Sequence, residues 1–271
     1  MLSSARNQRN VRPPAVAGTF YPGEATALRR TTGGLLAGAR QPSASAACAI
    51  IAPHAGYVYS GPVAAEAFAA VKSLAGAVRR AVVIGPAHYV SFRGIAAPSA
   101  AAFGTPLGEM PVEEQAVEAA ARLSQIVIDD SPHAPEHALE VELPFLQTIF
   151  GALPIIPLVV GRTSGEEVAE VLAQQWDDRT LLVVSSDLSH YHDYATAKQI
   201  DAETAAAIES LDERSIGPND ACGYLPIRGL LMEARRRGLA AHRLDLRNSG
   251  DTAGDRRSVV GYGAWAFVGH A

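Results

Sequence analysis

Three histidines in the sequence follow apolar runs that are broken by proline, glycine or serine. His54 comes after "CAIIAP", His88 after "AVVIGPA" and His190 after "LLVVSSDLS". Ligand crevices in open α/β sheets lie outside the carboxyl ends of the strands. Because imidazoles presented from rigid elements suit a divalent metal ion, we expect His54 and His88 to be metal ligands. Each histidine taken alone could instead cap a helix or hydrogen-bond a neighbouring loop.

The segment "SSDLSHYHD" places a carboxylate near an imidazole. Asp187 and His190 are three residues apart, which brings them onto one face if a helical turn begins here. A carboxylate that fixes the tautomer of a histidine makes a general acid–base unit, and we assign that role to this pair. The alternative is that Ser185, Ser186 or Asp187 only caps a helix, with the histidines on the surface. The role of His192 stays open.

The segment "SPHAPEHALEVELPFLQTIF" offers a further histidine. Pro135 is typical of a first helical turn, so we expect a helix over 136–150. His137 and Glu140 are then one turn apart and share a face, which makes His137 a candidate pocket residue. The apolar stripe of the same helix leaves Glu142 facing water.

Cys222 stands at the predicted start of a helix over 223–237. Helix N-termini lower the pKa of a thiol, and a thiolate is a metal ligand. A free cysteine is also commonly a small buried hydrophobic residue, and composition does not decide between the two. We assign Cys48, inside a predicted strand, to the core. Two cysteines so far apart do not suggest a disulfide framework.

The elements that must position these residues are short β-branched runs alternating with Ala-rich stretches of helical period. We predict strands over 48–53, 81–86, 94–99, 126–129, 155–160, 181–186, 242–246 and 259–269. We predict helices over 62–74, 112–123, 136–150, 165–176, 196–211 and 223–237. Several strands are continuously apolar, which suits a sheet covered on both faces. The predicted fold is α/β: a single-domain three-layer sandwich with a mostly parallel central sheet covered by helices on both faces.

No linker, charge block or low-complexity segment divides the 271 residues. We therefore expect a flexible N-terminal segment over 1–15 and one α/β domain over 16–271. A net charge of −5 argues against a nucleic-acid partner. The longest apolar run, "GALPIIPLVVG", is too short to span a bilayer, and the first residues contain no apolar signal core. We expect a cytoplasmic protein without a membrane partner.

Common nucleotide and hydrolase motifs are absent from the sequence. It contains no G-x-x-x-x-G-K-[ST] phosphate loop and no G-x-G-x-x-G fingerprint. A G-x-S-x-G nucleophile elbow is missing as well. These absences speak against a nucleotide-binding protein and a serine hydrolase.

An ordered set of motifs resembles the Memo family, whose bacterial and archaeal members are often called AmmeMemoRadiSam system protein B. The motifs are "AGTFYPG", "IIAPHAGYVYSG", "VVIGPAHY", "TPLGEMPVE", "EHALEVELPFLQ", "VVSSDLSHY", "CGYLPIRGLL" and "SGDTAGDRRSVVGY". They run in order from about Ala17 to Phe267. The resemblance implies a single α/β domain similar to the class III extradiol dioxygenases, non-haem iron enzymes that open catechol rings.

The resemblance also implies a metal site made of two histidines and a cysteine. The histidine of the family's "APHAGY" motif falls on His54, that of "GPAHY" on His88, and the cysteine of "CG" on Cys222. All three presumed ligands are present in this chain.

The family's pocket residues have counterparts here too. The aspartate and histidine of "SSD..H" fall on Asp187 and His190. The "EHALE" element implies that His137 and Glu140 lie in or beside the same pocket. The family usually has serine where this chain has Ala138, a difference that affects local hydrogen bonding only.

These residues lead to two main hypotheses about function. The catechol-cleaving relatives use two histidines and a carboxylate, whereas a thiolate is softer, more readily oxidised and more favourable to copper or zinc. We expect Fe(II), with copper and zinc as alternatives. The first hypothesis is oxygen-dependent chemistry on a catecholic or phenolic small molecule, with His190 moving a proton. The second is a metal-binding, redox or regulatory accessory protein that works with a radical-SAM partner. Zinc-dependent hydrolysis is a third and weaker alternative.

Overall fold

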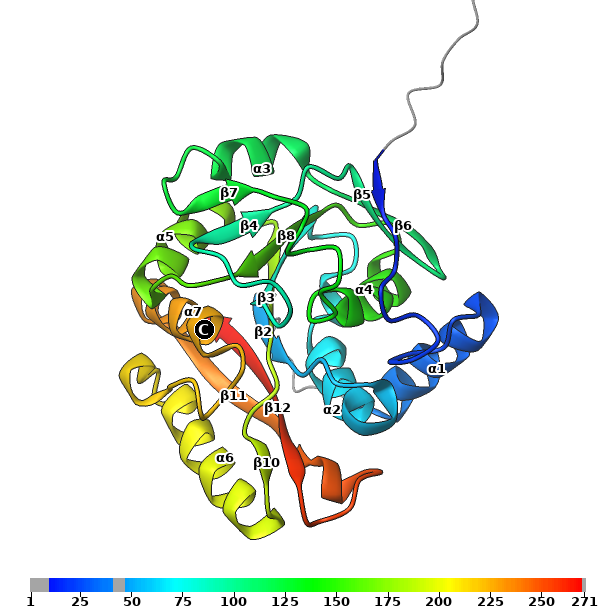
Figure 1. Ribbon diagram of the computed structural model, residues 1–271, viewed down its shortest axis with the longest axis vertical. Helices are drawn as coiled ribbons and strands as arrows, with labels where there is room; N and C mark the ends of the chain where they lie inside the picture. Colours follow the sequence, from blue (N-terminus) through cyan, green and yellow to red (C-terminus); the bar gives the residue numbers. More distant parts are fainter. Residues whose placement is uncertain (1–9, 41–46, 270–271) are drawn as a thin grey trace, which may run out of the picture.

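The computed structural model describes residues 10–40 and 47–269, and its main feature is one large mixed sheet (Figure 1). The sheet has nine strands. Along its main path the order is β10 (His190–His192), β12 (Val259–Gly269), β2 (Ala49–Ala52), β9 (Thr180–Ser185), β3 (Arg80–Pro86), β8 (Ile155–Val160), β4 (Ile95–Ala97) and β7 (Ile126–Ile128). The ninth strand, β11 (Leu239–Asn248), pairs with β12.

The centre of this sheet is parallel. Strands β2, β9, β3 and β8 all run the same way, while β12 and β4 flank them in the antiparallel sense. Every residue of β2, β8 and β9 is buried. Such continuous apolar runs are expected where helices cover both faces of a parallel sheet.

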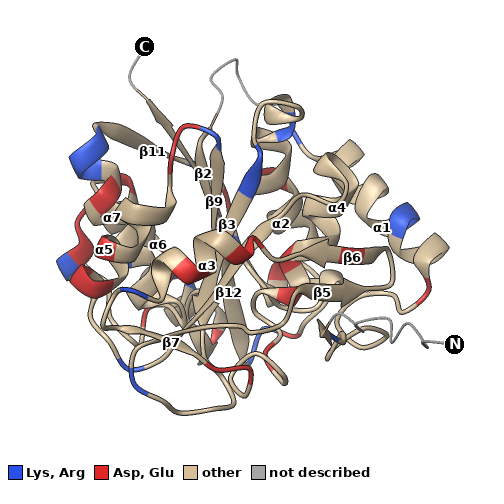
Figure 2. Cartoon of the chain, turned by 90° about the horizontal axis from the view of Figure 1, so that it is seen from above, with Lys and Arg blue, Asp and Glu red and all other residues tan. Residues whose placement is uncertain are grey.

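The helices form two layers, one on each face of the sheet (Figure 1). The layer on one face contains α1 (Ala25–Gly38), α2 (Tyr57–Ala70) and α4 (Leu143–Phe150). The other contains α5 (Gly165–Gln175), α6 (Tyr194–Glu209) and α7 (Tyr224–Arg237), and α3 (Glu114–Ala120) packs on α5. Figure 2 shows charged residues on the outer helices and few on the central strands. The predicted single-domain three-layer α/β sandwich is confirmed. No helix in the described ranges is long and apolar enough to cross a membrane.

Strand register brings the candidate residues to one edge of the sheet. Ala52 at the end of β2 pairs with Ser185 at the end of β9, and Ile84 of β3 lies opposite Val184 of β9. The carboxyl ends of these three strands are therefore nearly level. The residues that follow them include His54, Asp187 and His88.

A small second sheet holds the start of the described chain. It consists of β1 (Val11–Arg12), β5 (Ala102–Thr105) and β6 (Gly108–Pro111). The Arg12 side chain is buried and forms an ion pair with Glu140. Arg12 thus ties β1 to the rest of the chain, and residues 1–9, the larger part of the segment expected to be flexible over 1–15, lie outside the described part of the chain.

Local sequence patterns located most elements but missed several. The predicted helix over 136–150 is wrong in its first half: a 3₁₀ turn covers Glu140–Glu142 and α4 begins at Leu143, with Pro144 in its first turn. Helix α1 escaped prediction because its glycines and threonines have low helix propensity. Strands β1, β5, β6 and β10 were missed as well, since each has only two to four residues.

Candidate metal centre

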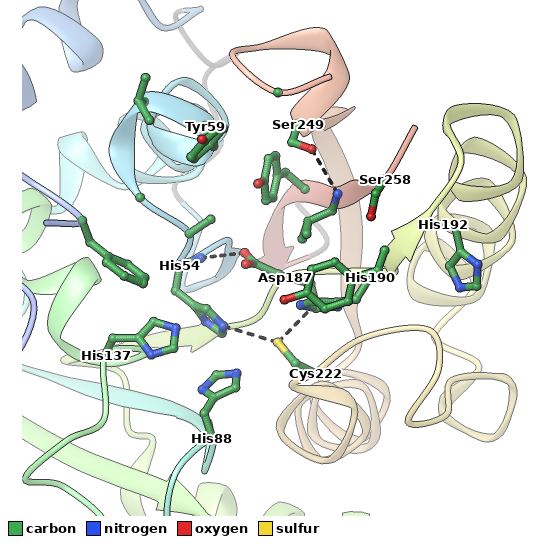
Figure 3. Close-up of a pocket in the computed structure, with 18 of the residues that line it drawn as sticks. His54, Tyr59, His88, His137, Asp187, His190, His192, Cys222, Ser249 and Ser258 are labelled. Atoms are coloured by element: carbon green, nitrogen blue, oxygen red, sulfur yellow. Dashed lines mark hydrogen bonds between the residues drawn. The ribbon is translucent and has the colours of Figure 1, made fainter. Parts of the chain in front are cut away.

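Two imidazoles and one sulfur converge at the edge of the sheet where β2 and β3 end. His54 follows β2, His88 follows β3, and Cys222 precedes α7. Their ligand atoms all lie within 4.8 Å of one another, and Cys222 Sγ is 3.3 Å from His54 Nε2 (Figure 3). The structure thus brings together the three residues that the sequence nominated as metal ligands.

A buried hydrogen-bond chain orients the His54 ring. His54 Nδ1 lies 2.9 Å from Ser185 Oγ, and Ser185 donates its only proton to Ala138 O at 2.7 Å. Ser185 Oγ also lies 2.7 Å from Glu142 Oε1, a carboxyl whose pKa is raised well above its usual range by burial. Because Ser185 holds His54 Nδ1, the other ring nitrogen, Nε2, is the one that contacts Cys222 Sγ. Burial and the neighbouring histidines hold the pKa of His54 well below its usual value, so the ring is neutral.

Glu136 orients the second imidazole. Its Oε1 lies 2.8 Å from His88 Nδ1, and its Oε2 accepts the His88 backbone N–H at 2.7 Å. Burial opposes ionisation of Glu136, but its hydrogen bonds with His88 bring the pKa of this carboxyl below its usual value. A carboxylate on the outer ring nitrogen is the common support of a metal-binding histidine, and it leaves His88 Nε2 free.

A second group of close donor atoms consists of His88, Glu136 and His137. Both Glu136 oxygens already accept hydrogen bonds. Besides its contacts with His88, Glu136 Oε1 accepts the backbone N–H groups of His137 and Ala138, each at 3.0 Å. This carboxylate is therefore committed to holding the loop and the His88 ring. The group with Cys222 is the better metal candidate.

Cys222 reaches the site because α7 approaches β9 closely. Gly223 caps α7, and its N–H donates to Ser186 Oγ at 2.9 Å. A Cβ at position 223 would come within 2.6 Å of the Ser186 side chain, so only glycine fits. Burial, followed by the charge of Asp187, raises the pKa of the Cys222 thiol, contrary to the lowering expected from the helix N-terminus. A bound cation reverses this, because coordination deprotonates a thiol.

Asp187 and His190 do not form the expected pair. After β9 the chain stays extended and His190 opens β10, so there is no helical turn to align them. Asp187 Oδ1 accepts the backbone N–H of His54 at 2.8 Å, and the described residues contain no hydrogen bond between Asp187 and His190. Burial raises the pKa of Asp187 to about 7. Burial lowers the pKa of His190, which a hydrogen bond to the Leu188 backbone partly offsets.

A large cavity of about 1460 Å³ opens in front of the three ligands. His137, Asp187 and His190 line it together with the ligands, and His192 lies on its far side (Figure 3). The ring of Phe20 packs 4.8 Å from that of His137, whose Nδ1 is 3.2 Å from the Tyr89 hydroxyl. Burial lowers the pKa of His137 to about 4, so this ring is neutral at pH 7.

The two other acidic residues of the "EHALEVE" segment lie away from this cavity. Glu140 accepts hydrogen bonds from Arg12, Tyr21 and the backbone of Val16, so it does not share a pocket face with His137. Glu142 is fully buried and does not face water. The expectations for both residues were wrong because residues 136–139 are not helical.

Sequence reasoning missed the supports of the ligands. Glu136, Ser185 and Glu142 all lie within motifs that were singled out, but their roles depend on contacts across 43 to 131 positions. The one available signal was the carboxylate of Glu136 in the motif that also supplies the pocket residue His137. A carboxylate that accompanies a candidate metal site is a reasonable candidate for the support of one of its histidines.

Comparisons with known proteins found related sequences along most of the chain. A family model described as "Memo-like protein" matches residues 12–266. A MEMO1 family protein of Sulfurisphaera tokodaii is 34% identical over 278 residues, covering 93% of this chain and 97% of the relative. One from Thermotoga maritima is 35% identical over 275 residues, with 93% and 97% coverage. One from Nitrosopumilus maritimus is 32% identical over 279 residues, with 95% and 100% coverage.

One solved structure is similar in fold. The uncharacterized protein JW3007 from Escherichia coli K12 superimposes with a TM-score of 0.50 at 14% identity. The match covers 82% of this chain and 99% of that one. At this identity the likeness concerns the fold alone.

Proposed function

The chain belongs to the Memo family, and on this premise we propose that His54, His88 and Cys222 bind one Fe(II) ion for oxygen-dependent chemistry on a phenolic small molecule. One observation carries the metal assignment. The ligand atoms of two imidazoles and one thiol lie within 4.8 Å of one another beside a cavity, and all three residues line it.

The donor set fits a first-row metal ion. Bonds of about 2.0 Å to nitrogen and 2.3 Å to sulfur in tetrahedral geometry separate the two donors by roughly 3.5 Å. The separation between His54 Nε2 and Cys222 Sγ is 3.3 Å. Two imidazoles and a thiolate also suit copper and zinc, which are the competing ions.

When bound, Fe(II) would supply Lewis-acid and redox chemistry toward oxygen and a catecholic or phenolic substrate. The protein's own contribution is positioning and proton transfer. His190 lines the cavity and is neutral at pH 7 because burial lowers its pKa, so it can accept a proton from a substrate hydroxyl. Asp187 holds the His54 backbone, and His137 forms part of the cavity wall.

The thiol ligand supports an alternative function. A family that replaced the carboxylate of the ring-cleaving enzymes with the softer Cys222 could also have abandoned turnover. The chain would then be a metal-binding redox or regulatory protein in the cytoplasm, working with a radical-SAM partner.

Metal reconstitution followed by oxygen uptake separates these functions. The protein is loaded with Fe(II) without air, bound metal is counted, and oxygen consumption is measured with and without a catechol panel. We expect one ion per chain, and less than one tenth of that in Cys222→Ala. Uptake that requires both catechol and His190 supports the oxygen-dependent reaction. One bound ion per chain, with oxygen consumption that does not depend on catechol, supports the accessory function. A wild-type protein that binds no metal would rule out both functions.

A further inference from the structure

A second cavity lies behind the metal centre. It has a volume of about 390 Å³ and is lined by the loop after β3, the end of β8 and the start of α7. His88, Tyr89 and Cys222 line both cavities, so the second cavity lies next to two of the candidate ligands. Its volume is within the usual range for small-molecule sites, roughly 300 to 1000 Å³.

The two cavities differ in charge. The lining of the large one includes Asp187, Asp220 and Asp255 but no arginine or lysine. The second cavity has no aspartate or glutamate in its lining, and Arg162 is its one arginine or lysine among the described residues. The charge of this lining is therefore opposite in sign to the net charge of the chain, which is −5. Arg162 therefore attracts an anion to the second cavity, where no carboxylate opposes it.

Arg162 is available to a ligand. Many arginines of the chain pair with a carboxylate, as Arg80 does with Asp177 and Arg235 with Glu213. The guanidinium of Arg162 takes part in none of the ion pairs or side-chain hydrogen bonds formed within residues 10–40 and 47–269. Its backbone is fixed, because Arg162 N–H donates to Phe92 O at 2.9 Å and Arg162 accepts from Gly94 N–H at 2.9 Å.

A second cation stands next to it. Arg93 and Arg162 are partners in a parallel β-bridge, so their side chains leave the same side of the backbone pair. Arg93 is exposed, and within the described ranges it has no carboxylate partner either. Arg93 does not line the cavity, but a second cation beside Arg162 adds to the positive potential there.

The rest of the lining combines apolar and polar surface. Phe92, Val160, Leu225 and Pro226 contribute hydrocarbon surface, and Ser91 and Thr163 contribute hydroxyls. Such a combination suits a ligand with an apolar body and one charged end. A carboxylate matches the planar fork of a guanidinium with two parallel hydrogen bonds.

We propose that the second cavity binds a small organic carboxylate, with Arg162 pairing with the carboxylate and the apolar body packing against Phe92, Val160 and Pro226. This site requires no metal ion. It goes beyond the proposed function, since its ligand occupies a cavity separate from the large one and contacts no metal ion.

Calorimetric titration with benzoate and its neutral counterpart benzyl alcohol tests the proposal. In the wild type we expect benzoate to bind at least tenfold more tightly than benzyl alcohol. Arg162→Gln should remove that difference, while Arg30→Gln on α1, an exposed arginine away from the cavity, should keep it. Phenyl phosphate serves as a second anion, and binding tighter than that of benzoate would contradict the choice of a carboxylate.

A plugged variant tests whether the anion enters the cavity. Ser91 lines the cavity from an exposed position, so Ser91→Trp fills the space without disturbing the core. We expect it to weaken benzoate binding at least tenfold. Equal binding of benzoate and benzyl alcohol, no benzoate binding, or unchanged binding in Arg162→Gln or Ser91→Trp would each overturn the proposal. Metal content measured on the same samples reports separately on the metal centre.

Discussion

His88 and Glu136 are joined twice: the Glu136 carboxylate accepts the His88 ring Nδ1–H at 2.8 Å and its backbone N–H at 2.7 Å. The double contact fixes both the position of the loop and the rotation of the ring. His88 is otherwise solvent-accessible, so this carboxylate is what directs its free nitrogen toward His54 and Cys222.

Replacing this carboxylate should weaken metal binding. In Glu136→Gln the strong charge-assisted acceptor is lost, and we expect metal affinity to fall about 10- to 100-fold, as for other supports of metal-binding histidines. Competition with a chelator of known affinity measures it. Glu203→Gln, an exposed change on α6, is the matched control. Equal affinities in the two variants would show that Glu136 does not orient a ligand.

Ser185→Ala should destabilise the folded protein. It removes the hydrogen-bond partner of His54 Nδ1 and leaves the buried Glu142 carboxyl without its Ser185 contact. We expect a loss of about 1–3 kcal/mol in the free energy of unfolding, as for other buried polar groups that lose a partner. Urea denaturation measures this loss. The exposed Ser210→Ala serves as control, and a loss no greater than that of the control would contradict the buried chain.

The buried Asp201 should make stability depend on pH. Burial raises its pKa to about 6 in the folded protein, although it accepts the Ser189 N–H at 3.0 Å. The folded state holds the Asp201 proton more tightly than the unfolded chain does. Protonation of Asp201 therefore stabilises the fold, and this stabilisation is fully present below pH ~4 and is lost as pH rises through ~6. Asp201→Asn keeps an acceptor oxygen and removes the titration. We expect the variant to gain about 1–3 kcal/mol relative to the wild type between pH 4 and pH 7.

Denaturation curves at several pH values check the Asp201 prediction. The difference in free energy of unfolding between variant and wild type should grow with pH up to about pH 6–7 and then level off. A difference that is constant across this range would mean that Asp201 does not titrate as its burial implies.

The pair of Arg12 and Glu140 should be a strong tether of the chain's first strand. Both side chains are buried, and Glu140 also accepts from Tyr21 and the backbone of Val16. Glu140→Gln leaves Arg12 buried without a counter-charge, which costs about 3–5 kcal/mol. The double variant with Arg12→Met should recover part of that loss in urea denaturation. A double variant less stable than Glu140→Gln alone would contradict the isolated-charge explanation.

Local sequence patterns were sufficient for the layers of the fold. The continuous apolar runs of β2, β8 and β9 indicated strands covered on both sides, and the Ala-rich stretches between them indicated the covering helices. The strand over 259–269 was predicted with its exact bounds. Short strands such as β10 were missed because three residues carry too little pattern to distinguish them from a loop.

Strand ends indicated His54 and His88 as ligands, and a predicted helix start made Cys222 a candidate. The family resemblance then implied that these three residues form one metal site. The sequence could not reveal what holds them, because those contacts are made between distant segments. Glu142 looked like a solvent-facing helix residue, yet it is buried against Ser185. Asp187 looked like a partner of His190, yet it holds the His54 backbone.

The sequence by itself therefore determined the fold class, the family and the chemical types of the candidate ligands, since these depend on local periodicity and motif identity. Tertiary structure alone decided which ring nitrogen of His54 and of His88 is directed toward the metal site. It also decided that burial raises the pKa of the Cys222 thiol, and that Arg162 lines a second cavity with no carboxylate in its lining. The reason is physical: hydrogen-bond direction, desolvation and local charge all depend on which distant segments pack against a group.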